Sequence, residues 1–88
     1  MISAQVSVVN VLGLHARAAA RFVHLAGQFQ SRIKVTRGSQ TVDGKSILGL
    51  LLLAAARGTS LEISADGSDE QQAIDALVSL AVRGFEDP

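Results

Sequence analysis

Apolar and polar positions alternate along parts of the chain with the period of two that is typical of half-buried strands. Residues 2–8 and 61–65 show this alternation clearly. Residues 33–37 and 40–42 are two shorter β-favouring runs, and the pair Gly38-Ser39 between them fits a two-residue hairpin turn with glycine first. The pattern therefore predicts four strands, two of which form a hairpin.

Residues 16–27 switch to the helical period, and Gly27 suits the end of this helix. One face is apolar and is predicted to be buried; it consists of Ala18, Ala19, Phe22, Val23, Leu25, Ala26 and Phe29. Another face carries a polar stripe at helical spacing: Arg17, Arg21, His24 and Gln28. The segment therefore predicts an amphipathic helix that packs on the sheet.

Two further helices are predicted nearer the C-terminus. Ser46 is placed as the N-cap of a short, very apolar helix that ends before Gly58. The run Ser68-Asp69-Glu70-Gln71 fits a capping box at the start of the last helix, which stops near Gly84. This last helix is predicted to bury Ala73, Ile74, Leu77, Val78 and Ala81.

The predicted element order is βαββαβα. Each helix has an apolar stripe to bury and each strand has a polar side, which favours a two-layer α/β (α+β) fold with three helices on one face of a four-stranded sheet. The hairpin makes one strand pair antiparallel, and we expect the whole sheet to be antiparallel. We expect residues 1–88 to form a single domain.

The composition indicates a folded domain and excludes several kinds of site. Apolar residues make up 48% of the chain and charged residues 18%, which is typical of a folded domain. The chain has no cysteine, which excludes a disulfide, a thiol nucleophile and a cysteine-based zinc site. The longest apolar run has ten residues, whereas crossing a bilayer takes about 20. No signal-peptide pattern opens the sequence, so we expect a cytoplasmic protein without a membrane-inserted segment.

The net charge is zero, but the charges are sorted along the chain. Residues 1–45 hold six basic side chains and one acidic, whereas residues 46–88 hold two basic and seven acidic. Two outcomes are open: a charged face for a partner of opposite charge, or interleaving of the two halves on folding. Nucleic acid is not expected as a partner, because the basic set is small and the chain has no Trp or Tyr for base stacking.

One segment combines several features that suit chemistry, Gly13-Leu14-His15-Ala16-Arg17-Ala18-Ala19-Ala20. His15 is predicted to lie where a loop enters a helix, beside backbone N–H groups that lack intrahelical partners and form the positive end of the helix dipole. These groups would bind an anion attached to the imidazole, and Arg17 can offer a planar set of N–H donors to phosphoryl oxygens. The arrangement suits a transiently phosphorylated histidine.

The residue pattern alone leaves other interpretations open. A histidine at a helix start is also compatible with a surface residue or a helix cap, and His24 is compatible with a solvated residue on the polar stripe. No metal site is predicted, because the two histidines have neither a cysteine nor nearby carboxylates. No cofactor is expected either.

The segment Gly13-Leu14-His15-Ala16-Arg17 closely resembles the active-site motif of the HPr family, the histidine phosphocarriers of the bacterial phosphoenolpyruvate:sugar phosphotransferase system. Lys45-Ser46-Ile47-Leu48 resembles the regulatory-serine motif of this family, and residues 63–71 resemble the segment before its last helix. The resemblance covers essentially the whole chain. One position departs: Ala18 replaces the usual proline, which is expected to loosen the first helical turn slightly while the chemistry survives.

The resemblance implies an open-faced β-sandwich and a phosphocarrier that is not an enzyme on its own. His15 would accept a phosphoryl group on Nδ1 from phosphorylated enzyme I and donate it to an enzyme IIA, and Arg17 would contact that group. Ser46 would be the site that an HPr kinase/phosphorylase modifies, although a role as helix cap alone also explains a serine there. The family favours a monomer.

The resemblance also implies a docking surface for these partners around His15 and the short second helix. Its apolar part would consist of Ile47, Leu48, Leu51 and Leu52. Its basic rim would consist of Arg21, His24 and Lys45, which fits partners with acidic docking faces. Some side chains of residues 47–53 must belong to the core, but six large apolar residues in seven positions exceed one buried stripe.

Two other functions stay open. In the first, the chain is a regulatory module, for example of a nitrogen-related paralogous system, in which phosphorylation of His15 or Ser46 switches partner binding. Neighbouring genes would separate this function from sugar transport. In the second, the chain is a protein-binding domain whose histidine is unused, and failure of any enzyme I to charge it would favour that function.

Overall fold

The computed structural model describes residues 1–87 and shows the predicted order of elements, followed by a short 3₁₀ turn at Gly84–Glu86. The predicted domain boundary at residue 88 lies outside the described residues. The strands are β1 (Ile2–Ser7), β2 (Arg32–Arg37), β3 (Gln40–Asp43) and β4 (Ser60–Asp66). The helices are α1 (Ala16–Ala26), α2 (Ile47–Leu52) and α3 (Glu70–Val82).

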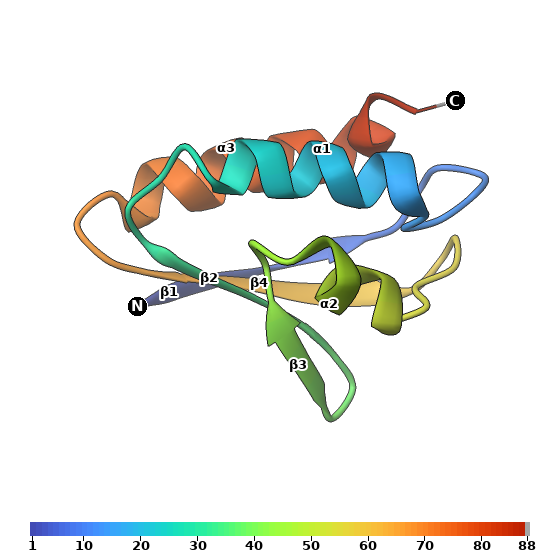
Figure 1. Ribbon diagram of the computed structural model, residues 1–88, viewed down its shortest axis with the longest axis horizontal. Helices are drawn as coiled ribbons and strands as arrows, with labels where there is room; N and C mark the ends of the chain where they lie inside the picture. The colour runs from blue at the N-terminus through green and yellow to red at the C-terminus, as the bar shows by residue number, and fades with distance from the viewer. Residues whose placement is uncertain (88) are drawn as a thin grey trace.

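The four strands form one antiparallel sheet in the order β1-β4-β2-β3. α1 and α3 lie side by side over one face of this sheet, and α2 packs against α1 (Figure 1). The predicted open-faced fold with an antiparallel sheet is therefore confirmed. β2 and β3 form the predicted hairpin, in which Arg37 pairs with Gln40 and Gly38 has φ +59°. Glycine adopts this left-handed conformation without the steric cost of a side chain.

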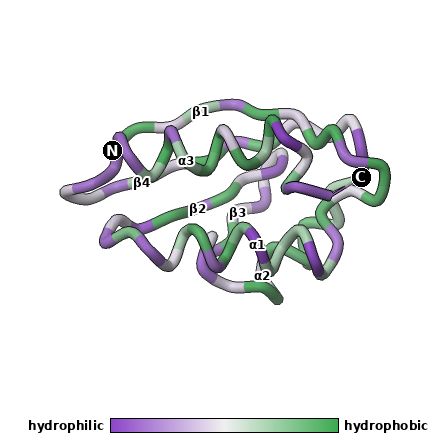
Figure 2. Tube along the Cα trace, turned by 90° about the horizontal axis from the view of Figure 1, so that it is seen from above, coloured by the Kyte–Doolittle hydropathy of each residue, from purple (hydrophilic) through white to green (hydrophobic). Residues whose placement is uncertain are grey.

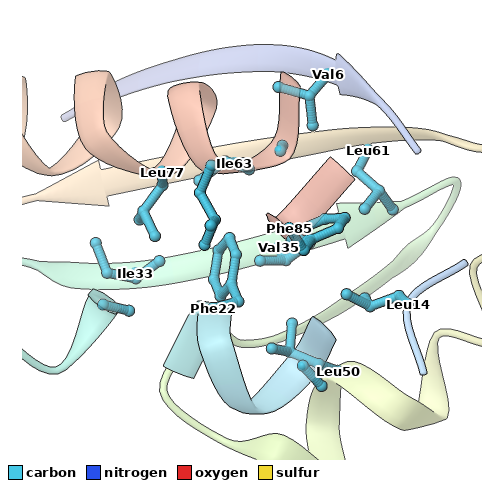
Figure 3. Close-up of a cluster of buried hydrophobic side chains, with 14 of the residues drawn as sticks. Val6, Leu14, Phe22, Ile33, Val35, Leu50, Leu61, Ile63, Leu77 and Phe85 are labelled. Carbon is cyan, nitrogen blue, oxygen red and sulfur yellow. The ribbon is translucent and has the colours of Figure 1, made fainter. Parts of the chain in front are cut away.

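The core lies between the sheet and the helices. Along β1, α1 and α3 the colour changes repeatedly between hydrophobic and hydrophilic, whereas α2 contains only apolar residues and one glycine (Figure 2). Val35 and Ile63, which pair across β2 and β4, are buried against Phe22 of α1 and Leu77 of α3 (Figure 3). The period-2 pattern of the strands therefore directs one side of the sheet into the interior.

α2 is shorter than the apolar run that predicts it. The helix ends at Leu52, and Ala54 has a left-handed backbone with φ +49°, which is incompatible with a continuing helix. Leu53 is fully buried and Ala55 nearly so. The apolar residues after the helix therefore anchor an irregular connection to β4.

The capping box predicted at residues 68–71 is wrong. The N-cap of α3 is Asp69 instead of Ser68, and the Asp69 side chain makes no capping hydrogen bond. Its carboxylate accepts from the backbone N–H groups of Gln30 and Ser31 at 2.8 and 3.0 Å and from Ser31 Oγ at 2.6 Å. The carboxylate therefore binds the loop after α1 instead of capping the helix. A local sequence motif does not reveal this contact.

Asp69→Asn is expected to weaken the dependence of stability on acidic pH. Hydrogen bonds from Ser31 and Gln30 hold the pKa of the Asp69 carboxyl below its usual range. The stabilisation by the ionised carboxyl is therefore complete above the unfolded-state pKa of about 3.9 and is lost as the pH falls through the lower pKa of the folded state.

Urea unfolding between neutral pH and about pH 3 measures this effect. Ser31→Ala removes the hydroxyl donor and should change the pH dependence in the same direction, but less. Stability curves of the wild type and Asp69→Asn that run parallel over this range would contradict the assignment of this carboxylate.

Candidate functional site

His15 forms the N-cap of α1, at the end of the loop that follows β1. Its backbone is extended, and its Nδ1 accepts a hydrogen bond from the backbone N–H of Arg17 at 3.2 Å. The ring is thus held against the first turn of the helix, whose N–H groups carry partial positive charge. The side chain stays 23% exposed, so a partner can reach it.

The loop before His15 is fixed by hydrogen bonds to its backbone, one from the Asn10 side chain and one with the segment after α2. Asn10 Nδ2 donates to the Gly13 carbonyl oxygen at 2.7 Å, and the Leu14 N–H donates to the Ala55 carbonyl oxygen at 2.9 Å. Gly13 has φ +69°, and a Cβ at this position would lie 2.5 Å from the Ala55 oxygen. Glycine is required by both the conformation and the space, and it directs the following histidine to the helix start.

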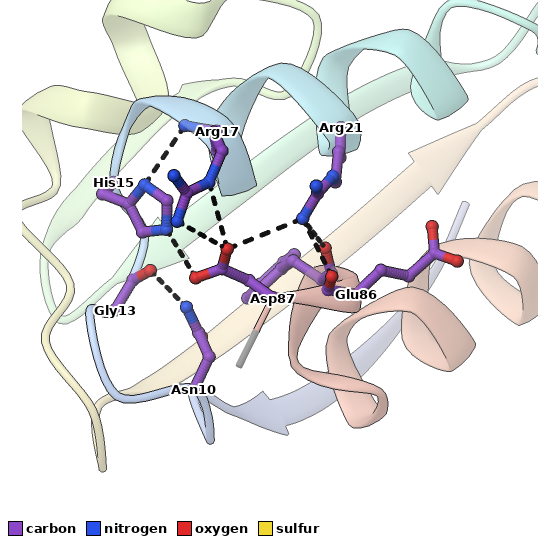
Figure 4. A network of polar contacts seen from close by, with 8 residues as sticks. Asn10, Gly13, His15, Arg17, Arg21, Glu86 and Asp87 are labelled. Atoms are coloured by element: carbon purple, nitrogen blue, oxygen red, sulfur yellow. Dashed lines mark hydrogen bonds and ion pairs between the residues drawn. The ribbon is translucent and has the colours of Figure 1, made fainter.

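A carboxylate that the sequence pattern does not reveal completes the site. Asp87 lies 72 positions from His15, and its Oδ2 is 2.8 Å from Nε2 of the imidazole (Figure 4). Oδ1 of the same carboxylate accepts from Nε and Nη2 of Arg17 at 3.1 and 2.9 Å. The Asp87 side chain is only 1% exposed. The expectation that the histidines have no nearby carboxylate is therefore wrong.

The two ring nitrogens of His15 have different partners. Hydrogen bonds from His15 and, next, from Arg17 hold the pKa of Asp87 below its usual range, so the carboxylate is ionised and can only accept. Nε2 must then donate, while Nδ1 accepts from the Arg17 backbone N–H. The contacts therefore select the tautomer with a hydrogen on Nε2 and a lone pair on Nδ1.

α3 ends at the same end of the molecule at which α1 begins, so the C-terminal tail lies beside the start of α1 and Asp87 reaches the site (Figure 1). Gly84, Phe85 and Glu86 all have left-handed backbones, with φ of +66°, +57° and +59°. This conformation costs about 1–2 kcal/mol for each non-glycine residue. Burial of Phe85 and two 3.0 Å hydrogen bonds from Arg21 Nη1 to the carbonyl oxygens of Phe85 and Glu86 offset that cost. In the sequence, the apolar aromatic residue Phe85 just after the last helix indicates a buried anchor for the tail.

At this site the two oppositely charged halves of the chain interleave. Arg17 and Arg21 come from the basic half, whereas Asp87 comes from the acidic half. The Asp87 carboxylate lies 2.9 Å from Nη2 of Arg17 and 3.7 Å from Nη1 of Arg21. The tail therefore neutralises part of the positive charge beside His15.

The apolar residues predicted to form the docking surface all reach the exterior of α2. They are between 37% and 68% exposed: Ile47, Leu48, Leu51 and Leu52. Leu50 and Leu53, from the same run, are in the core with 1% and 0% exposure. Helix geometry thus divides this run between core and surface.

The basic residues predicted to form the rim do not make one cluster. Arg21 and His24 line a shallow groove between α1 and the end of α3. Lys45 instead donates from Nζ to the Phe29 carbonyl oxygen at 2.7 Å, at the loop that follows α1. Arg21 and Lys45 therefore both make hydrogen bonds within the chain, and His24 is the exposed member of this set.

Ser46 is the N-cap of α2, and its Oγ accepts from the Gly49 backbone N–H at 3.0 Å. Ser46→Ala is expected to lower the free energy of unfolding by about 1 kcal/mol, because a first-turn N–H loses its acceptor. For a domain of this size that corresponds to a melting temperature about 4–8 °C lower. Ser46→Asn keeps a capping acceptor and should retain most of the stability. Equal melting temperatures for the wild type and Ser46→Ala would contradict the capping role.

Residues 1–87 show neither a cluster of metal-binding side chains nor a membrane-spanning helix. No three or more His, Cys, Asp or Glu side chains gather there in a way that would hold a metal ion. In the same part of the chain, every helix is too short or too polar to span a membrane.

Known proteins match the chain over nearly its whole length. A family model described as PTS HPr component phosphorylation site matches residues 2–82. The phosphocarrier protein HPr of Cupriavidus necator is 45% identical over 85 residues, which cover 97% of this chain and 96% of that protein. Its counterpart from Neisseria meningitidis serogroup A is 48% identical over 85 residues, with 97% and 94% covered.

A solved structure extends the match to three dimensions. HPr-C-His from Thermoanaerobacter tengcongensis superposes with a TM-score of 0.95 at 40% sequence identity, and the match covers 100% of this chain and 99% of that one. Sequence and fold therefore agree over the segment that carries His15 and over the sheet and helices that position it. The chain belongs to the HPr family, the phosphocarrier proteins of the phosphotransferase system.

Proposed function

We propose that the protein carries a phosphoryl group on Nδ1 of His15, received from phosphorylated enzyme I and passed to an enzyme IIA. The hydrogen bond from the Arg17 backbone N–H to Nδ1, at 3.2 Å, is the observation that supports this most. This hydrogen bond indicates that Nδ1 is the nitrogen with the lone pair, and that the lone pair points toward backbone N–H groups. The same N–H groups would bind an anion attached to Nδ1.

Acceptance forms an N–P bond at Nδ1 while the bond from phosphorus to its donor breaks, and the donor keeps that electron pair. The phosphoryl oxygens then replace Nδ1 as acceptors of the first-turn N–H groups. The guanidinium of Arg17, which follows the ring by two residues, adds charged donors to the same oxygens. Donation to an acceptor regenerates neutral imidazole, so the protein is a carrier and not an enzyme by itself.

The exposed apolar side of α2, together with Arg21 and His24, is proposed as the docking surface that enzyme I and enzyme IIA use in turn. Large exposed apolar side chains supply buried area, and basic neighbours select partners with acidic faces. The proposal places a monomer in the cytoplasm and involves no cofactor.

Ser46 is proposed as a second modification site in a host that has an HPr kinase/phosphorylase. Its Oγ is half-buried at the start of α2, directly before the exposed Ile47 and Leu48. A phosphate there adds nearly two negative charges beside the docking surface. Modification would therefore repel an acidic partner without touching His15.

Incubation with phosphoenolpyruvate and the cognate enzyme I tests the proposal. The expected product carries one phosphoryl group, which is stable in alkali and lost in acid, as an N–P bond requires. Phosphorylation of the cognate enzyme I itself by phosphoenolpyruvate, measured in the same reaction, shows that the assay works. Absence of labelling with an active cognate enzyme I would contradict the proposed function.

A further inference from the structure

Both carboxylate oxygens of Asp87 contact side chains of the site, although the proposed phosphoryl transfer gives Asp87 no role. Oδ2 lies 2.8 Å from Nε2 of His15, and Oδ1 lies 2.9 Å from Nη2 of Arg17 (Figure 4). A carboxylate that is 1% exposed is tolerated only where such partners compensate for lost hydration. We infer that Asp87 is a positioning residue for phosphoryl transfer by His15, an inference that rests on the proposed function.

The first effect of Asp87 concerns the lone pair that attacks phosphorus. With the hydrogen on Nε2, Nδ1 has no proton to lose before the N–P bond forms. The opposite tautomer would place the Nδ1 hydrogen against the Arg17 backbone N–H at 3.2 Å and the Nε2 lone pair against the carboxylate at 2.8 Å. Both of those contacts would be repulsive. The carboxylate therefore excludes the tautomer that cannot react at Nδ1.

The second effect concerns the charge that develops during transfer. Nδ1 supplies the electron pair of the new N–P bond, the donor keeps the pair of the broken one, and Nε2 keeps its hydrogen. The ring thereby becomes a phosphorylated imidazolium with a positive charge. An anion 2.8 Å from Nε2 and shielded from water stabilises that charge. Asp87 gains no proton and forms no covalent bond, so it acts through His15.

The tail holds Asp87 in place without help from the imidazole. Phe85 is buried in the core, and Arg21 Nη1 binds the carbonyl oxygens of Phe85 and Glu86, both at 3.0 Å. The carboxylate is therefore fixed before a partner arrives, which is what preorganisation of a reacting group requires. Removing only the Asp87 side chain should leave the tail turn folded.

Asp87→Ala tests the inference with two readouts. In the uncharged, ¹⁵N-labelled wild type, the Nε2–H proton of His15 should be visible by NMR, because its hydrogen bond slows exchange with water. This signal should vanish in Asp87→Ala. Charging by phosphoenolpyruvate and enzyme I should be roughly 10- to 100-fold slower, the range found when the hydrogen-bond partner that orients a metal-binding histidine is removed. Asp87→Glu restores a carboxylate and should recover part of both.

Glu86→Ala is the matched control, because it removes the neighbouring carboxylate, which pairs with Arg83 at 3.6 Å instead of with His15. It should leave both readouts at the wild-type level. Circular dichroism establishes that each variant is folded. Folded Asp87→Ala that charges as fast as the wild type, or faster, would overturn the inference and leave the proposed function standing. A wild type that is never charged would overturn the proposed function itself, whatever the Nε2–H signal shows.

Discussion

His15→Ala is expected to abolish labelling by phosphoenolpyruvate and enzyme I completely. The variant keeps the first-turn N–H groups and the Arg17 guanidinium, which are proposed to bind the phosphoryl group, but it has no lone pair at which an N–P bond can form. Groups that bind an anion give no covalent product without a nucleophile, so the expected loss is total. Intact-mass spectrometry of the incubated protein measures it.

His24→Ala is the companion variant, because it removes the other histidine and leaves His15 in place. It should still be labelled to completion, at a rate that reports the contribution of His24 to docking. Circular dichroism must show that His15→Ala is folded, since this position is the N-cap of α1. Persistent labelling of folded His15→Ala would refute the site.

Phe85→Ala is expected to lower the free energy of unfolding by about 3–5 kcal/mol. The side chain is 1% exposed and lies beside Val35 and Phe22 in the core (Figure 3). The variant also loses the burial that offsets a left-handed backbone at φ +57°. A loss of this size is a large part of the roughly 4–13 kcal/mol expected for a chain of this length.

Urea unfolding of Phe85→Ala measures this loss, with Val82→Ala as control. Val82 is 67% exposed, so its truncation should change stability by less than about 0.5 kcal/mol. Because Phe85 anchors the tail, the folded fraction of Phe85→Ala should also charge slowly, as is expected of Asp87→Ala. A loss below about 1 kcal/mol would contradict the anchoring role.

The sequence predicts the elements that depend on local pattern. Period-2 alternation predicts β1 and β4, short β-favouring runs predict β2 and β3, and Gly38-Ser39 predicts the hairpin, because these features act over a few residues. The role of Ser46 as a helix cap is predicted for the same reason. The motif around His15 likewise places the ring at the start of α1, since Gly13 and the following helix determine that position locally.

The features that the sequence did not reveal depend on contacts between distant residues. The residues around Asp69 predict a capping box. Its carboxylate instead accepts a hydrogen bond from the loop after α1, 38 positions away. Asp87 reaches His15 across 72 positions, after a turn in which Gly84, Phe85 and Glu86 all have left-handed backbones. The residue types near the C-terminus indicate an acidic tail. The position of this tail in the fold depends on how α3 packs beside α1.

Phosphorylation of Nδ1 in His15 is the central claim, and NMR of the charged protein tests it most directly. With ¹⁵N-labelled histidine, a coupling between phosphorus and a ring nitrogen identifies the atom that carries the group. We predict this coupling at Nδ1 of His15, with the hydrogen still on Nε2. Coupling at Nε2 of His15, or at either ring nitrogen of His24, would contradict the claim.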